Sequence, residues 1–178
     1  GEGWLAICFS KGSLEYGDRL GVGQRMVDKG VVWSVGRIFH GESQLYQFNL
    51  LPEPGHKRPA FINLQQFYAE AYLVDRVNEL PAVDLRWRNK VTALEVRNDG
   101  VVLAVATPDG PYRINAGYVI ACDGARSSLR QMVGAEFSGK VFEDQFLIAD
   151  VKMTAEFPTE RWFWFDPPFH AGRSALLH

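Results

Sequence analysis

The sequence predicts a mixed α/β fold, and three stretches carry this prediction. Residues 118–122 form a short apolar run that ends in Asp123-Gly124, which is typical of a buried strand entering a tight turn. Residues 64–77 place apolar side chains at helical spacing. Residues 91–116 divide into three strand-like runs separated by turn residues. A strand, a tight turn and a helix in this order build ligand crevices in α/β sheets.

The first part of the chain predicts a strand followed by two short helices. Residues 5–9 are apolar and predict the strand. Ser13 is a suitable cap for a helix that runs to about Leu20. Residues 24–29 predict a second helix, which Gly30 would end.

An extended region follows. Residues 31–40 predict a strand, and apolar and polar side chains alternate over residues 46–50, as in a half-buried strand. The two runs predict a hairpin around residues 41–43.

The most regular helical pattern comes next, with Leu64, Phe67, Ala71, Val74 and Val77 on one side. Asn63 would cap this helix, which puts Gln65 and Gln66 in its first turn. The backbone N–H groups of a first turn can bind phosphate.

The second half of the chain predicts mostly strands. They are expected at residues 83–87, at 91–97, 101–107 and 112–116 as an antiparallel meander, at 118–122, at 146–153, at 162–165 and at 174–178. Residues 162–165 read Trp-Phe-Trp-Phe, so alternate rings would lie on opposite faces, and one pair could face a substrate pocket.

Composition excludes several classes of function. The chain has 178 residues, 47% of them hydrophobic, and a net charge of -2. This charge gives no general surface for nucleic acid, and no apolar run is long enough to cross a membrane. Cys8 and Cys122 lie far apart and no metal-ligand spacing occurs, so we expect no metal site, a core position for Cys122 and a cytoplasmic protein.

Asp123, Gly124, Ser127 and Arg130 form the pattern D-G-x-x-S-x-x-R, with Ser127 as the cap of a following helix. After an apolar strand, this pattern resembles the second nucleotide-contacting motif of the FAD-dependent aromatic hydroxylases of the para-hydroxybenzoate hydroxylase type. The resemblance implies that these four residues bind FAD. It also implies a flavin contact for a glutamine at the start of the helix after residue 63, where Gln65 fits the spacing best and Gln66 second.

The resemblance extends over nearly the whole chain from about Leu5, and within the family the sequence is most similar to the 3-(3-hydroxyphenyl)propionate hydroxylase-like branch. It implies that residues 1–30 and 60–140 belong to a Rossmann-like FAD/NAD(P)-binding domain with a β-meander. Residues 31–59 and 141–178 would belong to the sheet of the substrate domain. The opening G-x-G-x-x-G and the later Gly-Asp motif of the family have no counterpart here. Gly21-Val22-Gly23 lacks a preceding strand and a third glycine. The sequence is therefore expected to be the middle of a longer protein.

The implied activity is hydroxylation of a phenolic substrate by an FAD-dependent monooxygenase that uses NADH or NADPH and O2. The chain alone is expected to be inactive, and a homodimer is compatible with the resemblance. No catalytic residue is assigned, and His40, His56, His170 and His178 are candidates for a base only by residue type. Two alternatives remain: another flavoprotein of this fold, a reductase or a halogenase, and a catalytically silent small-molecule-binding fragment.

Overall fold

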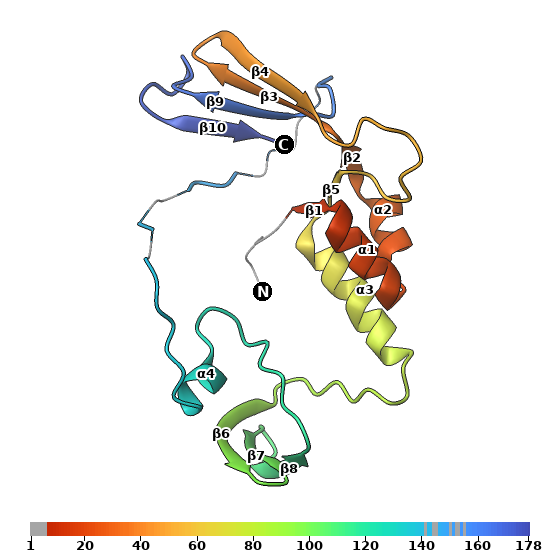
Figure 1. Cartoon of the computed structure of the whole chain (residues 1–178), viewed down its shortest axis with the longest axis vertical. Coiled ribbons are helices and arrows are strands. Elements are labelled where there is room, and N and C mark those ends of the chain that lie inside the picture. The colour runs from red at the N-terminus through yellow and green to blue at the C-terminus, as the bar shows by residue number, and fades with distance from the viewer. Residues whose placement is uncertain (1–6, 141, 144–145, 150, 152–153, 155) are drawn as a thin grey trace. The chain divides into compact units, whose positions relative to one another are not determined.

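The computed structural model describes residues 7–140, 142–143, 146–149, 151, 154 and 156–178. The chain divides into two compact units, residues 1–84 with 152–178 and residues 85–151, and each unit is described by itself (Figure 1). The described residues contain both helices and strands, interspersed along the chain, which confirms the mixed α/β fold. No helix in this described part is long and apolar enough to cross a membrane.

The first unit contains a small antiparallel sheet of three strands, and the strand that comes last in the sequence lies in the middle. The order is β1 (Cys8–Ser10), β5 (Phe61–Asn63) and β2 (Val31–Trp33). Ile62 of β5 pairs with Phe9 on one side and Val32 on the other. Leu5 and Ala6, the start of the predicted strand, lie outside the described residues.

Three helices pack against this sheet: α1 (Lys11–Leu20), α2 (Gly23–Lys29) and α3 (Gln66–Asn78) (Figure 1). Ile62 is fully buried among side chains from all three helices and their ends. The buried members of this core are Leu14, Val22, Met26, Ile62, Leu64 and Ala69. Leu14 of α1 and Met26 of α2 are the apolar side chains that these two helices bury, whereas Tyr16 and Leu20 of α1 are more than half exposed.

Two of the predicted helix caps are wrong. Ser10, in extended conformation, caps α1 and accepts a hydrogen bond from the backbone N–H of Ser13 at 3.4 Å. Asn63 lies in β5, and Gln65 is the N-cap of α3 without a side-chain hydrogen bond to the helix. In both cases the neighbouring strand, which the sequence did not delimit, decides where the helix can begin. Gly30 ends α2 as predicted.

The Gly21-Val22-Gly23 sequence connects α1 to α2. Gly21 caps α1 at φ +83°, a left-handed conformation that favours glycine. A Cβ on Gly23 would lie 2.8 Å from the carbonyl oxygen of Leu14, so Gly23 permits the close approach of the two helices. These glycines pack helices and form no dinucleotide-binding turn, in agreement with the sequence analysis.

A second sheet in the same unit has the order β10 (Ser174–Leu177), β9 (Arg161–Phe165), β3 (Val35–His40) and β4 (Ser43–Asn49). The β3–β4 hairpin is confirmed. β9 runs parallel to β3, and β10 antiparallel to β9. The sheet thus joins segments that the sequence analysis placed in one substrate domain, although the domain boundaries themselves stay a prediction.

The aromatic strand β9 shows the expected alternation. The rings of Trp162 and Trp164 lie 5.5 and 5.3 Å from that of Phe39 on one face. Phe163 and Phe165 contact each other at 4.7 Å on the other face. The first face is therefore a continuous aromatic surface made by β3 and β9.

The second unit contains the predicted meander and the predicted helix. The strands β6 (Lys90–Arg97), β7 (Gly100–Ala106) and β8 (Tyr112–Ala116) form an antiparallel sheet with β7 in the middle. Val102, Leu103 and Val105 of β7 are buried. The short helix α4 (Ser128–Met132) begins after Ser127, as predicted.

Three predicted strands are absent from the described residues. Residues 118–122 and 83–87 form no ladder, and neither do residues 146–149 and 151; residues 150, 152 and 153 lie outside the description. Tyr118 is 93% exposed and Ile120 is 86% exposed, and Cys122 is exposed rather than in a core. An apolar strand becomes buried only where neighbouring strands pair with it, and no described strand of this unit pairs with residues 118–122.

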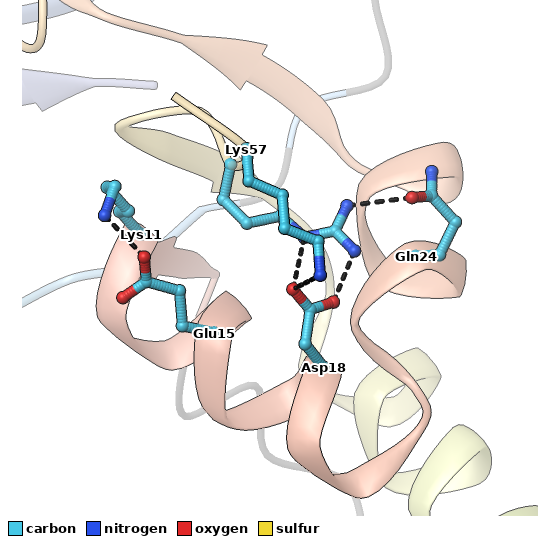
Figure 2. A network of polar contacts seen from close by, with 6 residues as sticks. Lys11, Glu15, Asp18, Gln24 and Lys57 are labelled. Carbon is cyan, nitrogen blue, oxygen red and sulfur yellow. Dashed lines mark hydrogen bonds and ion pairs between the residues drawn. The ribbon is translucent and has the colours of Figure 1, made fainter. Parts of the chain in front are cut away.

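A network of charged side chains attaches the loop before β5 to the helices (Figure 2). Arg58 is only 5% exposed. It donates from Nε to Asp18 at 2.9 Å, from Nη2 to the other oxygen of Asp18, and from Nη1 to Gln24 at 2.9 Å. Lys57 adds a second cation 2.9 Å from Asp18. These bonds hold the pKa of Asp18 at about 2, chiefly through the hydrogen bond from Arg58.

We predict that Arg58→Leu lowers the midpoint of thermal unfolding by roughly 5–10 °C, because it removes the buried partner of an ionised carboxylate. Arg25→Leu is the matched control, since Arg25 and Asp75 form an ion pair with both side chains about half exposed. Exposed pairs contribute little, so the control should shift the midpoint by less than about 2 °C. Circular dichroism during heating measures both, and equal shifts would contradict a special role for Arg58.

The contribution of Arg58 to the stability of the fold should depend on pH below about pH 4. Folding lowers the pKa of Asp18 from 3.8 to about 2, so the ion pair stabilises the fold fully above about pH 4. Its contribution is lost as the pH falls from about 4 to about 2, where Asp18 becomes protonated in both states. The difference in urea midpoint between the wild type and Arg58→Leu should shrink across that range. A difference that stays constant down to pH 2 would contradict this assignment.

Candidate cofactor-binding site

Asp123 is the centre of a compact cluster of hydrogen bonds in the second unit. Its Oδ1 accepts a hydrogen bond from the Ser127 hydroxyl at 2.5 Å. Its Oδ2 accepts one from the backbone N–H of Leu129 at 3.1 Å and a longer one from the Ser128 hydroxyl at 3.4 Å. The carboxylate is therefore fixed to the first turn of α4 by residues four to six positions later.

Ser127 connects this carboxylate to the helix. Its oxygen accepts a hydrogen bond from the backbone N–H of Arg130 at 2.9 Å while its own proton goes to Asp123. Ser127 is buried and Asp123 is exposed. The buried serine therefore links the carboxylate to α4 by hydrogen bonds, and the aspartate itself is exposed to solvent.

The same hydrogen bonds hold the pKa of Asp123 at about 2, with the Ser127 bond as the largest cause and the Leu129 N–H next. The group is therefore ionised at neutral pH. Both oxygens of this exposed carboxylate accept hydrogen bonds from the protein, and a carboxylate oxygen can accept more than one.

Gly124 provides the turn between this carboxylate and the helix. It has φ +79°, and its carbonyl oxygen accepts a hydrogen bond from the Ser127 N–H at 3.1 Å. A Cβ placed on Gly124 would meet no atom within 4 Å. Glycine is therefore needed here for its backbone conformation, and the open space beside it leaves room for a ligand.

Arg130 has contacts of its own within the loop. Its Nη2 donates to the carbonyl oxygen of Ala125 at 3.1 Å, and its guanidinium lies 4.9 Å from the ring centre of Phe137. These contacts brace the loop on both sides of α4. The predicted role of Arg130 in binding FAD stays a prediction.

The predicted glutamines lie in the first unit. Gln65 is exposed at the N-cap of α3, and its carbonyl oxygen accepts a hydrogen bond from the Tyr68 N–H at 3.0 Å. Gln66 donates to Glu70 at 2.6 Å, while its buried Oε1 has no hydrogen-bond partner among the residues that the structure describes. The structure therefore groups Asp123, Gly124, Ser127 and Arg130, and describes Gln65 separately in the other unit.

The Asp123 cluster fits the chemistry of the flavin dinucleotide that the resemblance implies. An exposed and ionised carboxylate suits the hydroxyl groups of a ribose or ribityl chain. Because the protein already fixes this carboxylate by hydrogen bonds, it would receive a ligand without first being ordered. The residues of this chain that would hold the cofactor at this point are Asp123 and the turn at Gly124.

Among the four histidines, His178 has a polar side-chain contact that joins the two sheets of the first unit. Its Nδ1 lies 3.5 Å from Sγ of Cys8, whose thiol donates to Asn63 at 3.2 Å. Burial raises the pKa of Cys8 and lowers that of His178, and Arg161 lowers both. Both groups are therefore neutral near pH 7, so this pair gives no reactive thiolate. His40, His56 and His170 are exposed.

Sequence reasoning missed two groups of residues. The Arg58–Asp18 pair joins residues forty positions apart, and the Cys8–His178 contact joins residues 170 positions apart. No local sequence pattern indicates either of these two contacts. The adjacent cations Lys57 and Arg58, in the loop before β5, are a signal in the sequence that could have drawn attention to the first.

Comparison with known proteins identifies the family. A model described as an FAD binding domain matches residues 5–173. Anhydrotetracycline monooxygenase of Streptomyces rimosus is 31% identical over 154 residues, which cover 82% of this chain and 30% of that protein. A 3-(3-hydroxy-phenyl)propionate/3-hydroxycinnamic acid hydroxylase of Burkholderia cenocepacia is 38% identical over 88 residues, which cover 49% of this chain and 16% of that protein.

A solved structure shows the same fold. The p-nitrophenol 4-monooxygenase PnpA of Pseudomonas putida superimposes with a TM-score of 0.73 at 24% identity, over 80% of this chain and 36% of that chain. The chain spans about a third or less of the length of these three proteins. Since the family model covers nearly all of the sequence, the chain belongs to the FAD-dependent monooxygenase family, whose members related to it include aromatic hydroxylases and tetracycline monooxygenases.

Proposed function

We propose that the protein carrying this sequence is an FAD-dependent monooxygenase that hydroxylates a phenolic aromatic substrate with NADH or NADPH and O2. The match of the FAD binding domain to residues 5–173 carries this proposal. The Asp123 cluster supports it, because it offers a fixed and ionised acceptor beside an open glycine turn.

FAD, when bound, would supply the redox chemistry that amino-acid side chains lack. The role of this chain is to hold the cofactor and position the substrate. Asp123 would accept a hydrogen bond from a cofactor hydroxyl, and Ser127 together with the Leu129 N–H would keep the carboxylate in place and ionised. Gln65 at the start of α3 and Arg130 are the further residues proposed to bind FAD.

The aromatic surface of β3 and β9 supports an aromatic substrate. Phe39, Trp162 and Trp164 form contacting rings on one face of this sheet. Such a face can pack against a phenolic ring in a stacked or edge-on arrangement. Residues 31–59 and 141–178 are accordingly proposed as part of the substrate-binding sheet, and residues 1–30 and 60–140 as part of the FAD-binding domain. The hydroxylase of Burkholderia cenocepacia supports the 3-(3-hydroxyphenyl)propionate-like branch as the finer assignment.

We predict that Asp123→Ala weakens FAD binding by about tenfold or more, the size expected when one hydrogen bond to a charged group is lost. The measurement is the Kd of FAD from the quenching of flavin fluorescence. Ser127→Ala is the matched comparison, because it removes the cap of α4 but leaves the carboxylate. It should weaken FAD binding less than Asp123→Ala does.

Asp99→Ala is the control for loss of one surface carboxylate, since Asp99 is exposed in the turn between β6 and β7. It should leave the affinity for FAD unchanged. Equal FAD affinity of Asp123→Ala and the wild type would contradict the assigned role of Asp123. Equal losses in Asp123→Ala and Ser127→Ala would show that only the fold of the loop matters.

The reaction itself is tested by NAD(P)H oxidation with and without phenols. A phenolic substrate should increase the rate of oxidation several-fold and appear as a hydroxylated product by mass spectrometry. Oxidation that phenols leave unchanged, without a hydroxylated product, would favour a reductase. A purified protein without flavin absorbance and without FAD binding would favour a non-enzymatic module.

A further inference from the structure

A network of polar side chains connects β4, β3 and the start of β9 in the second sheet of the first unit. Arg37 of β3 donates from Nε and from Nη2 to the two carboxylate oxygens of Glu160, at 2.6 and 3.0 Å. Its Nη1 donates to Gln44 of β4 at 3.0 Å. Glu160 directly precedes β9, so a forked ion pair fixes its carboxylate beside the first residues of that strand.

This network ends on a tryptophan of the aromatic surface made by β3 and β9. The indole Nε1–H of Trp162 donates to Oε2 of Glu160 at 2.7 Å, and the same oxygen accepts the Nε–H of Arg37. The centre of a Trp162 ring lies 5.5 Å from that of Phe39 and 5.7 Å from that of Trp164. One end of the indole therefore belongs to the polar network, while its rings belong to the aromatic surface.

Glu160 is well suited to fix this indole. Its side chain is 13% exposed, and the hydrogen bond from Arg37 is the largest cause that holds the pKa of its carboxyl below the usual range. The carboxylate is therefore ionised at neutral pH, which makes its hydrogen bond with the indole a charge-assisted one. β3 and β9 are already joined by their own backbone ladder, so the pairing of the strands does not require this bond.

We propose that Glu160 is a positioning residue, which holds the ring of Trp162 in the one orientation that contacts the aromatic ring of the substrate. The inference rests on the proposed function, because it takes the aromatic surface of β3 and β9 as the face that meets the substrate. An indole that is already fixed needs no ordering when a ligand ring packs against it. Ordering one side chain on binding costs roughly two- to tenfold in affinity.

NMR spectroscopy of the tryptophan indole N–H groups, with phenol as the probe, tests the proposal. The resonance that is missing from Trp162→Phe identifies Trp162, and the indole resonance of Trp164 reports the Kd of phenol in every variant. Glu160→Gln should move the Trp162 N–H resonance upfield, because a neutral acceptor makes a weaker hydrogen bond than a carboxylate. It should also weaken phenol binding by roughly two- to tenfold.

Glu95→Gln is the matched control, because Glu95 also pairs with an arginine, Arg97, but on the exposed surface of the other unit. It should leave both the Trp162 resonance and the Kd of phenol unchanged. Weakening of phenol binding by Glu95→Gln to the same extent as by Glu160→Gln would overturn the proposal.

A double-mutant cycle separates positioning of the indole from attachment of the strands. Phenylalanine at position 162 keeps an aromatic ring but lacks the N–H group, so Glu160→Gln should leave the Kd of phenol unchanged when it is made in Trp162→Phe. If Glu160 served only to hold Arg37 and the two strands, its replacement would weaken binding equally in both backgrounds. Equal weakening would therefore overturn the proposal, and so would a Kd that Glu160→Gln leaves unchanged in the wild type.

Failure of this inference is distinguishable from failure of the proposed function. A wild type in which phenol causes no saturable shift of the Trp164 resonance would overturn the role of Glu160. The proposed function would still stand if FAD binds and phenols stimulate NAD(P)H oxidation. Conversely, absence of FAD binding would overturn the proposed function, while the effect of Glu160→Gln on phenol binding is measured without any flavin chemistry.

Discussion

The buried ion pair between Arg58 and Asp18 is the constraint on which the first unit depends. β5 is the middle strand of its sheet, yet the chain reaches β5 only after a loop of eleven residues beyond β4. Arg58 attaches the end of that loop to α1 and α2 through Asp18 and Gln24. The backbone N–H of Lys11 then binds the carbonyl oxygen of Ala60 at 2.8 Å, next to the start of β5. Because a buried guanidinium is stable only with its partners, this pair permits few other courses for the loop.

The Asp123 cluster and the Arg58–Asp18 network differ in how far apart their residues lie in the sequence. The Asp123 cluster is built from residues within six positions of one another, so its turn and its serine cap could be predicted from the sequence alone. The meander was predictable for the same reason, since short turns join its strands. The Arg58 network and the Cys8–His178 contact depend on distant residues, and no pattern within a window of sequence contains that information.

Two strands were predicted, at residues 83–87 and 118–122, that the structure does not contain. Residues 118–122 form an apolar run, and residues 83–87 alternate apolar and charged side chains. Either pattern indicates only that burial of the apolar side chains is favourable, and not which neighbouring strand provides it. None of the strands described for this unit pairs with residues 118–122, and Tyr118 stays exposed. In residues 87–89, hydrogen bonding around Asn89 and the left-handed Arg88 replaces strand geometry with a turn. The missing partner strand accounts for the first case, and a local turn accounts for the second.

The Asp123 cluster also shows why a cofactor contact can be both local and specific. Its carboxylate is ordered by its own helix turn, so its orientation does not depend on the pairing of the exposed strand-like run before it. The cost of fixing the side chain is therefore met during folding of the loop, and little ordering remains for ligand binding. Gly124 supplies the one conformation that brings the aspartate back over α4. A substitution at Gly124 would thus act on the carboxylate through the backbone, even though a Cβ there would meet no neighbouring atom.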